Sequence, residues 1–186
     1  LTSIQMMFCA GVVFVAGMVR GFSGFALSAL IMASVALILS PLELIPICCI
    51  LEATASLIMF RGGLRDADMK IVWGLSIGSV IGFPVGLYAT TALPVEISKL
   101  VVLCIILGLA IALLLRASPK FLTRTSGLYA SGVTAGVVTG LAHVGGMVVA
   151  LYVLAREAPV RTMRASLVMF LVITTVTTLV YLFGFG

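Results

Sequence analysis

The stretch Arg20-Gly21-Phe22-Ser23-Gly24-Phe25 places a charged side chain inside an apolar run from Ile4 to Leu39. An arginine at membrane depth costs roughly 2.5–3.5 kcal/mol on insertion scales, so such a residue is a functional hypothesis from the outset. The glycines beside it favour a helix break, which a membrane tolerates only where protein buries it or it lines a cavity. A helix starting near Ser23 would direct free N–H groups toward the place that Arg20 reaches. This arrangement suits an anion, and the first candidate substrate contacts are Arg20, Gly21, Phe22, Ser23, Gly24 and Phe25.

A second candidate set lies in another broken apolar segment, Ser126 to Ala155. Its middle holds the single histidine of the chain, His143. The N–H groups of two following glycines would open a second half-helix, and the imidazole could donate to the same anion. A buried histidine with a purely structural role is the alternative. We expect the two half-helix N-termini to converge near the membrane midplane, with further substrate contacts at His143, Gly145, Gly146 and Met147.

Glu52 is a carboxylate near the middle of a predicted helix, Leu42 to Phe60. One interpretation pairs it with Arg20 for structure alone. The other gives it a role in proton coupling, because a desolvated carboxylate can load and release a proton during transport. Arg20 has matching alternatives: it either snorkels or pairs structurally, or its planar fork of donors holds an oxyanion.

The composition is that of a membrane protein: 62% of the residues are hydrophobic and 9% charged, and the mean hydropathy is +1.34. Soluble domains have about 45–50% apolar and about 25% charged residues. The net charge of +5 lies mostly in loops, where it indicates orientation and not a nucleic-acid partner. The four cysteines lack metal-site spacing, so we expect packing roles, no metal and no cofactor. A thiol enzyme using Cys48, Cys49 and His143 is the alternative to a protein that is not an enzyme.

Apolar periodicity and length predict an all-α polytopic protein with two broken segments. The second helix is followed by a predicted polar loop over residues 61–70. A later helix carries Gly78-x-x-x-Gly82-x-x-x-Gly86, a pattern that lets another helix approach closely, either within one protomer or across a homodimer. The predicted segments are Ile4 to Val19 with Phe25 to Leu39, Leu42 to Phe60, Ile71 to Ala92, Val95 to Leu115, Ser126 to Ala155, and Val160 to Phe185.

The two broken segments belong to an internal repeat. Gly17-x-x-x-Gly21 aligns with Gly136-x-x-x-Gly140 at an offset of 119 (136 minus 17), and Pro41 aligns with Pro159 at 118 (159 minus 41). Corresponding broken segments in two halves point to a transporter's binding site. Residues 1–118 form the first repeat and 119–186 an incomplete second one, so we expect about two more helices beyond Gly186.

Loop charge predicts the orientation of the repeats. The loops 61–70, 116–125 and 156–164 hold nine of the eleven Lys and Arg residues. They fall on one face only if each broken segment is a re-entrant hairpin, and the positive-inside rule then places that face in the cytoplasm and the N-terminus outside. Hairpins leave three crossings between equivalent points, an odd number, so the repeats have inverted topology.

At these residues the chain resembles the TauE/SafE sulfite exporter family, also called the toluenesulfonate uptake permease family. Three stretches carry the resemblance: Val19 to Ala26, Leu51 to Leu57 and Gly140 to Gly146. Each is weakly specific alone, but their order and spacing together are fairly specific. One departure is that the family usually continues the second Gly-Gly with proline, where Met147 and Val148 stand here.

The resemblance implies a multi-pass permease of the bacterial inner membrane that moves sulfite, a sulfonate or sulfoacetate. Our main hypothesis is alternating access, with the anion held by Arg20 and two half-helix N-termini and with proton or sodium coupling. An uncoupled anion channel built from the same parts is the alternative, and it would not need Glu52.

Overall fold

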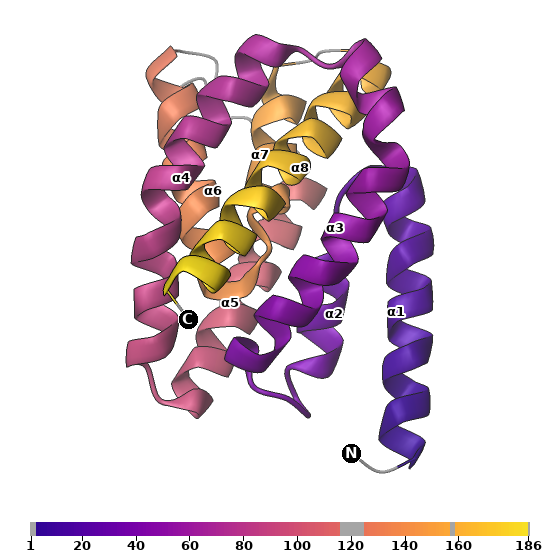
Figure 1. The fold of residues 1–186 in the computed structure, drawn as a ribbon, viewed down its shortest axis with the longest axis vertical. Coiled ribbons are helices and arrows are strands. Elements are labelled where there is room, and N and C mark those ends of the chain that lie inside the picture. Colours follow the sequence, from indigo (N-terminus) through magenta and orange to yellow (C-terminus); the bar gives the residue numbers. More distant parts are fainter. Residues whose placement is uncertain (1–2, 116–124, 157–158, 186) are drawn as a thin grey trace.

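The structure is a computed structural model that describes residues 3–115, 125–156 and 159–185. These residues contain helices and no strands. Most of the basic loop 116–125 and the expected repeat boundary at residues 118 and 119 lie outside them. The helices (Figure 1) are α1 (Ser3–Ser23), α2 (Leu27–Val35), α3 (Pro41–Asp66), α4 (Met69–Ala92), α5 (Val95–Leu114), α6 (Thr125–Ala142), α7 (Gly145–Ala155) and α8 (Val160–Phe185).

Five of the described helices are long and apolar enough to cross a membrane: α1, α3, α4, α5 and α8. This confirms the prediction of an all-α protein with several spans. The helices that follow the two breaks are short, with 9 residues in α2 and 11 in α7. Most of α2 and nearly all of α7 are buried, so these short helices lie in the interior of the bundle.

The first break lies later than the sequence predicts. α1 continues to Ser23, which places Arg20 in its last helical turn instead of in the break. Gly21 does not stop the helix, because one glycine costs only about 1 kcal/mol relative to alanine. Gly24 ends it by adopting a left-handed φ of +80°, as glycine does without strain. The N–H of Gly24 donates to the carbonyl of Arg20 at 2.9 Å.

α3 begins with a capping box and extends further than predicted. The Ser40 hydroxyl accepts from the Glu43 N–H, and the Glu43 carboxylate accepts from the Ser40 N–H at 2.9 Å. The helix then continues past Phe60 to Asp66, so the predicted loop over residues 61–70 is wrong for most of its length. Gly63 packs against α8 in this added part, and such close packing supports the helix.

The ends of α3 and α8 meet on one face of the molecule. Arg161 Nε lies 2.8 Å from Asp66 Oδ2, and the Asp68 N–H donates to Ser166 Oγ at 3.0 Å. Two of the three basic segments are therefore neighbours, which the hairpin interpretation requires.

The second break falls where the sequence predicts it. α6 ends at Ala142 and α7 begins at Gly145. His143 has a φ of +55°. It stands at the position that corresponds to Gly24 in the first break, at an offset of 119 (143 minus 24). A non-glycine residue in this conformation is uncommon, although histidine adopts it more often than most residues.

The chain contains two units with closely corresponding helix bounds: α1, α2 and α3 in the first, and α6, α7 and α8 in the second. α1 and α6 end 119 positions apart (142 minus 23), and α2 and α7 begin 118 apart (145 minus 27). α3 and α8 each have 26 residues and begin 119 apart (160 minus 41). In Figure 1, α1 runs upward and α2 returns, whereas α6 runs downward and α7 returns. Inverted repeats would produce this arrangement.

The glycine face of α4 packs against α6 of the same chain. A Cβ added to Gly78 would lie 2.8 Å from the backbone of Tyr129 and Val133, and one added to Gly132 would lie 2.6 Å from the carbonyl oxygen of Leu75. Gly82, Gly86, Gly136 and Gly140 meet the facing backbone in the same way. Of the two alternatives for this motif, the structure shows packing within one protomer.

Candidate anion-binding site

Arg20 and Glu52 form a buried ion pair at the centre of the candidate site. Arg20 Nη2 lies 2.9 Å from Glu52 Oε2, and the two side chains are 2% and 3% exposed. Glu52 Oε2 makes no hydrogen bond, so the contact is electrostatic and not aligned along an N–H. Breaking a buried pair by removing one partner typically costs about 3–5 kcal/mol, because the other charge is left uncompensated.

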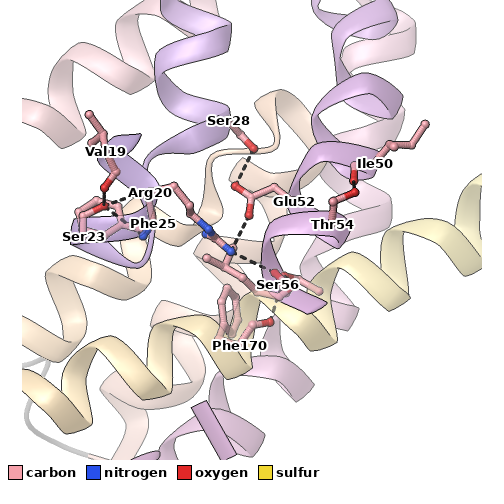
Figure 2. Close-up of polar contacts among 12 residues, drawn as sticks. Val19, Arg20, Ser23, Phe25, Ser28, Ile50, Glu52, Thr54, Ser56 and Phe170 are labelled. Atoms are coloured by element: carbon pink, nitrogen blue, oxygen red, sulfur yellow. Dashed lines mark hydrogen bonds and ion pairs between the residues drawn. The ribbon is translucent and has the colours of Figure 1, made fainter. Parts of the chain in front are cut away.

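Two serines extend this pair into a four-residue group, which we call the Arg20 cluster: Arg20, Ser28, Glu52 and Ser56 (Figure 2). The Ser28 hydroxyl donates to Glu52 Oε1 at 2.9 Å, and Arg20 Nη2 donates to Ser56 Oγ at 3.0 Å. Both serines are buried. The cluster joins α1, α2 and α3, so it depends on the break that lets α2 turn back beside α1.

The carboxylate of Glu52 contacts the first turn of α2. Ser28 is the second residue of that helix, so its contact with Glu52 Oε1 holds the carboxylate near the end where the N–H groups are free and the dipole is positive. The chain thus places one of its own anions where a helix N-terminus and an arginine meet.

Several buried nitrogen atoms of this region have no hydrogen-bond partner among the described residues. They include Arg20 Nε and Nη1, and His143 Nδ1. Leaving a buried polar group unpaired costs about 1–3 kcal/mol, and more for a charged one. His143 is 6% exposed and lies close enough to Arg20 for the guanidinium charge to act on the imidazole. The unpaired N–H groups of Arg20 at Nε and Nη1 are suited to binding an anion. Glu52 and Ser56 do not compete for them, because both contact Nη2.

The two breaks touch each other in the structure. A Cβ added to Gly146 would lie 3.6 Å from Cβ of Phe25, and these residues flank the starts of α7 and α2. Gly145 packs against Thr139 and Ala135 of α6 so closely that a Cβ would overlap them. Met147 is buried beside these glycines. The contact between Phe25 and Gly146 therefore brings the two breaks together, and His143, Gly145 and Met147 belong to the second of them.

Other candidates of the first stretch lie elsewhere or are engaged locally. Phe22 is 84% exposed, and nothing lies within 4 Å of a Cβ added to Gly21, so both face outward from α1. The Ser23 hydroxyl bonds to the backbone of Val19 and Phe25 and closes the turn. Gly24 lies under Arg164 of α8. These four residues shape the break or face away from the cluster.

Sequence reasoning missed Ser28, Ser56 and the bonds that hold the helix ends. Ser56 lies four residues after Glu52 and hence on the same helix face, and Ser28 lies in the first turn of a half-helix; both signals were available. Arg164 Nη2 donates to the carbonyl of Gly21 at the end of α1. At the end of α6, Thr90 Oγ1 reaches the carbonyls of Gly140 and Leu141. These last two contacts depend on helix packing and have no local sequence signal.

The cysteines near the cluster have surroundings typical of packing. Cys48 and Cys49 are buried, and Cys49 Sγ faces the carbonyl of Thr175 at 3.9 Å. Within the described residues no group of three or more His, Cys, Asp or Glu residues could hold a metal ion.

A small pocket reaches the cluster from the side. It has a volume of about 160 Å³, lies between α3 and α8, and includes Ser56 and Thr175 in an otherwise largely apolar wall. Ser56 belongs both to this wall and to the Arg20 cluster. A second hollow of about 610 Å³ lies at the basic face and is lined by Arg161, Arg164 and Asp66.

Comparison with protein families identifies the chain. The family model described as sulfite exporter TauE/SafE matches residues 9–186. This protein belongs to the TauE/SafE family. Comparison with curated proteins and with solved structures gave no match. The resemblance inferred from Val19 to Ala26, Leu51 to Leu57 and Gly140 to Gly146 is confirmed as family membership, and this TauE/SafE chain is a membrane transporter of the sulfite-exporter type.

Proposed function

We propose that this TauE/SafE protein carries sulfite or a small organosulfonate across the membrane by alternating access, with the anion held at the Arg20 cluster. The observation that carries the proposal is the buried guanidinium of Arg20, which has Nε and Nη1 unpaired. A planar fork of N–H donors can bind two oxygens of an oxyanion at once. The family description supplies the sulfur oxyanion.

Glu52 occupies the place of the transported anion in this arrangement. It lies against Arg20 and contacts Ser28 in the first turn of α2, the same partners that an external oxyanion would use. An incoming anion beside an ionised Glu52 would put two negative charges against one arginine in a buried site. Protonation of Glu52 removes that repulsion, so we propose that anion binding and proton binding to Glu52 occur together.

The remaining parts of the site support this cycle. His143 Nδ1 has no partner among the described residues, and in the tautomer with the proton on Nδ1 it donates to the bound anion from the second break. Arg161 and Arg164 line the hollow at the basic face, where a positive potential concentrates anions. The two half-helices rock against each other as the site opens to one side and then to the other.

The test is flux of radiolabelled sulfite and of a small sulfonate into proteoliposomes. The double variant Arg20→Gln with Glu52→Gln removes both buried charges together, so neither is left unpaired. We expect saturable flux in the wild type and a loss of tenfold or more in the double variant, since a hydrogen bond to a charged group contributes about 1.5–3 kcal/mol. Arg65→Gln, at an exposed arginine of α3 that does not line the hollow at the basic face, is the matched control and keeps its flux.

Each other outcome rejects a defined part of the proposal. Flux that persists in the double variant would keep the transporter and reject the Arg20 cluster as its site. Absence of flux for both anions would reject the substrate class. Fast flux that does not saturate and is not accompanied by proton movement would identify an uncoupled channel.

A further inference from the structure

The outer face of α1 has no neighbour in the described part of the chain. Nothing lies within 4 Å of a Cβ added to Gly17 or Gly21. Of the apolar stretch of α1 that is long enough to cross a membrane, only 11% is buried, against 56% for that of α4. Met7, Phe14 and Met18 are all more than half exposed. Figure 1 shows α1 at one edge of the bundle, opposite α4 and α6.

The equivalent face of α6 is fully covered. Gly136 and Gly140 stand 119 positions after Gly17 and Gly21 (136 minus 17, 140 minus 21), the same offset that relates the ends of the two helices. A Cβ added to Gly136 would overlap the backbone of Ser79, and one added to Gly140 the backbone of Phe83. The same pair of glycines is thus packed against α4 in one unit and open in the other.

The connection of α4 to the first unit shows where its counterpart belongs. α4 begins at Met69, after α3 ends at Asp66. It then lies against α6 of the other unit, and Thr90 donates to carbonyls at the end of that helix. α8 corresponds to α3, so a helix that follows α8 would, by the inverted relation, lie against α1.

We propose that the Gly17–Gly21 face of α1 is the docking surface for a transmembrane helix of this same protein that follows α8 and stands to α1 as α4 stands to α6. Its chemistry follows from that of α4. It carries small residues at every fourth position facing α1, because only these allow backbone contact. It also carries a serine or threonine near the first break, which bonds to the carbonyl of Phe22 as Thr90 bonds to that of Leu141.

The first test is thermal unfolding of the full protein in detergent with leucine placed at Gly17. Overpacking of a helix contact destabilises, so Gly17→Leu lowers the midpoint by several degrees, as does Gly136→Leu at the contact seen with α4. The matched control is Gly11→Leu on another side of α1, which leaves the midpoint near that of the wild type. An unchanged midpoint for Gly17→Leu would overturn the proposal.

The second test identifies what covers the face. A spin label at position 17 is expected to show low oxygen accessibility in liposomes, and one at position 11 high accessibility of the kind that lipid contact gives. High accessibility at both positions would mean that lipid covers the face and would overturn the proposal. Conversion of a dimer to a monomer by Gly17→Leu, measured by light scattering, would also overturn it, because the occupant would then be a second copy.

Discussion

Arg20 is the residue on which the candidate site depends. Its contacts indicate two roles: Nη2 holds the cluster together, and Nε and Nη1 are open to a ligand. It is almost fully buried, yet only Nη2 contacts described residues of the cluster, Glu52 and Ser56. A guanidinium kept only for structure would be expected to have its donors satisfied. The unpaired Nε and Nη1 therefore favour a ligand, with Glu52 as the partner that holds the site together without it.

Glu52→Gln tests the proposed coupling at this residue. The amide keeps the shape of the side chain and the bond to Ser28 but cannot take up a proton. We expect sulfite flux to persist while proton movement into the vesicles, followed with an internal pH-sensitive dye, falls to the background of empty liposomes. Glu43→Gln, at the exposed capping box of α3, is the control and leaves proton movement intact. Equal proton movement in Glu52→Gln and wild type would contradict the coupling role.

His143 allows backbone strain to be separated from imidazole chemistry. Its φ of +55° is unfavourable for a residue with a Cβ by roughly 1–2 kcal/mol. His143→Gly and His143→Ala both remove the imidazole, but only glycine removes the strain. We expect the glycine variant to be more stable than the alanine variant by about 1 kcal/mol in thermal unfolding.

Flux measurements on the same two variants address function. Both should transport sulfite more slowly than the wild type if the imidazole contacts the anion. Full flux in both variants would leave His143 with a structural role only, and equal stability of the two would contradict the left-handed backbone at this position.

At the level of helices, much of the architecture could be predicted from the sequence because apolar length and glycine position are local signals. The starts of α5 and α8 were predicted at the observed residues. The end of α1 was not, because Gly21 looks like a breaker but the turn needs the left-handed φ of Gly24. The end of α3 was not either, because packing of Gly63 on α8 overrides the polar composition around it.

The glycine contact between α4 and α6 predicts that alanine has opposite effects on stability at Gly82, inside the contact, and at Gly108, outside it. Gly82→Ala places a methyl group against the backbone of Val133, so we expect a loss of at least about 1–3 kcal/mol in stability. Gly108→Ala on α5 meets nothing within 4 Å, and alanine is favoured over glycine in a helix by up to about 1 kcal/mol. Its unfolding midpoint should therefore stay level or rise. Equal midpoints for the two variants would contradict the close contact.

For the whole molecule, the composition indicated a membrane protein, and the family match agrees. The site was only partly predictable, because Arg20, Glu52 and His143 stand out as polar residues in apolar segments, whereas Ser28 and Ser56 resemble the many other small residues of the chain. Their positions in α2 and α3 were local signals, but their contacts with the ion pair become visible only when three helices meet. The polar centre therefore consists of the buried Arg20–Glu52 pair and two serines that resemble many others in the sequence.

The basic face predicts the orientation of the whole molecule in the membrane. The Arg161–Asp66 ion pair brings the segment after α3 to the segment before α8, and α4 carries the chain from this face to the opposite one at Ala92 (Figure 1). The positive-inside rule assigns the basic face to the cytoplasm. We therefore expect a cysteine at the exposed position of Arg65 to react with an impermeant maleimide only after intact cells are permeabilised.

Thr91→Cys is the matched position at the other end of α4, since it is equally exposed and lies in the last turn of that helix. It should react in intact cells, with the wild-type protein as the blank for the native cysteines. The opposite result at both positions would reverse the orientation while keeping the fold. Reaction of both cysteines from the same side would contradict the crossing of α4, and with it the odd number of spans on which the inverted relation of the two units rests.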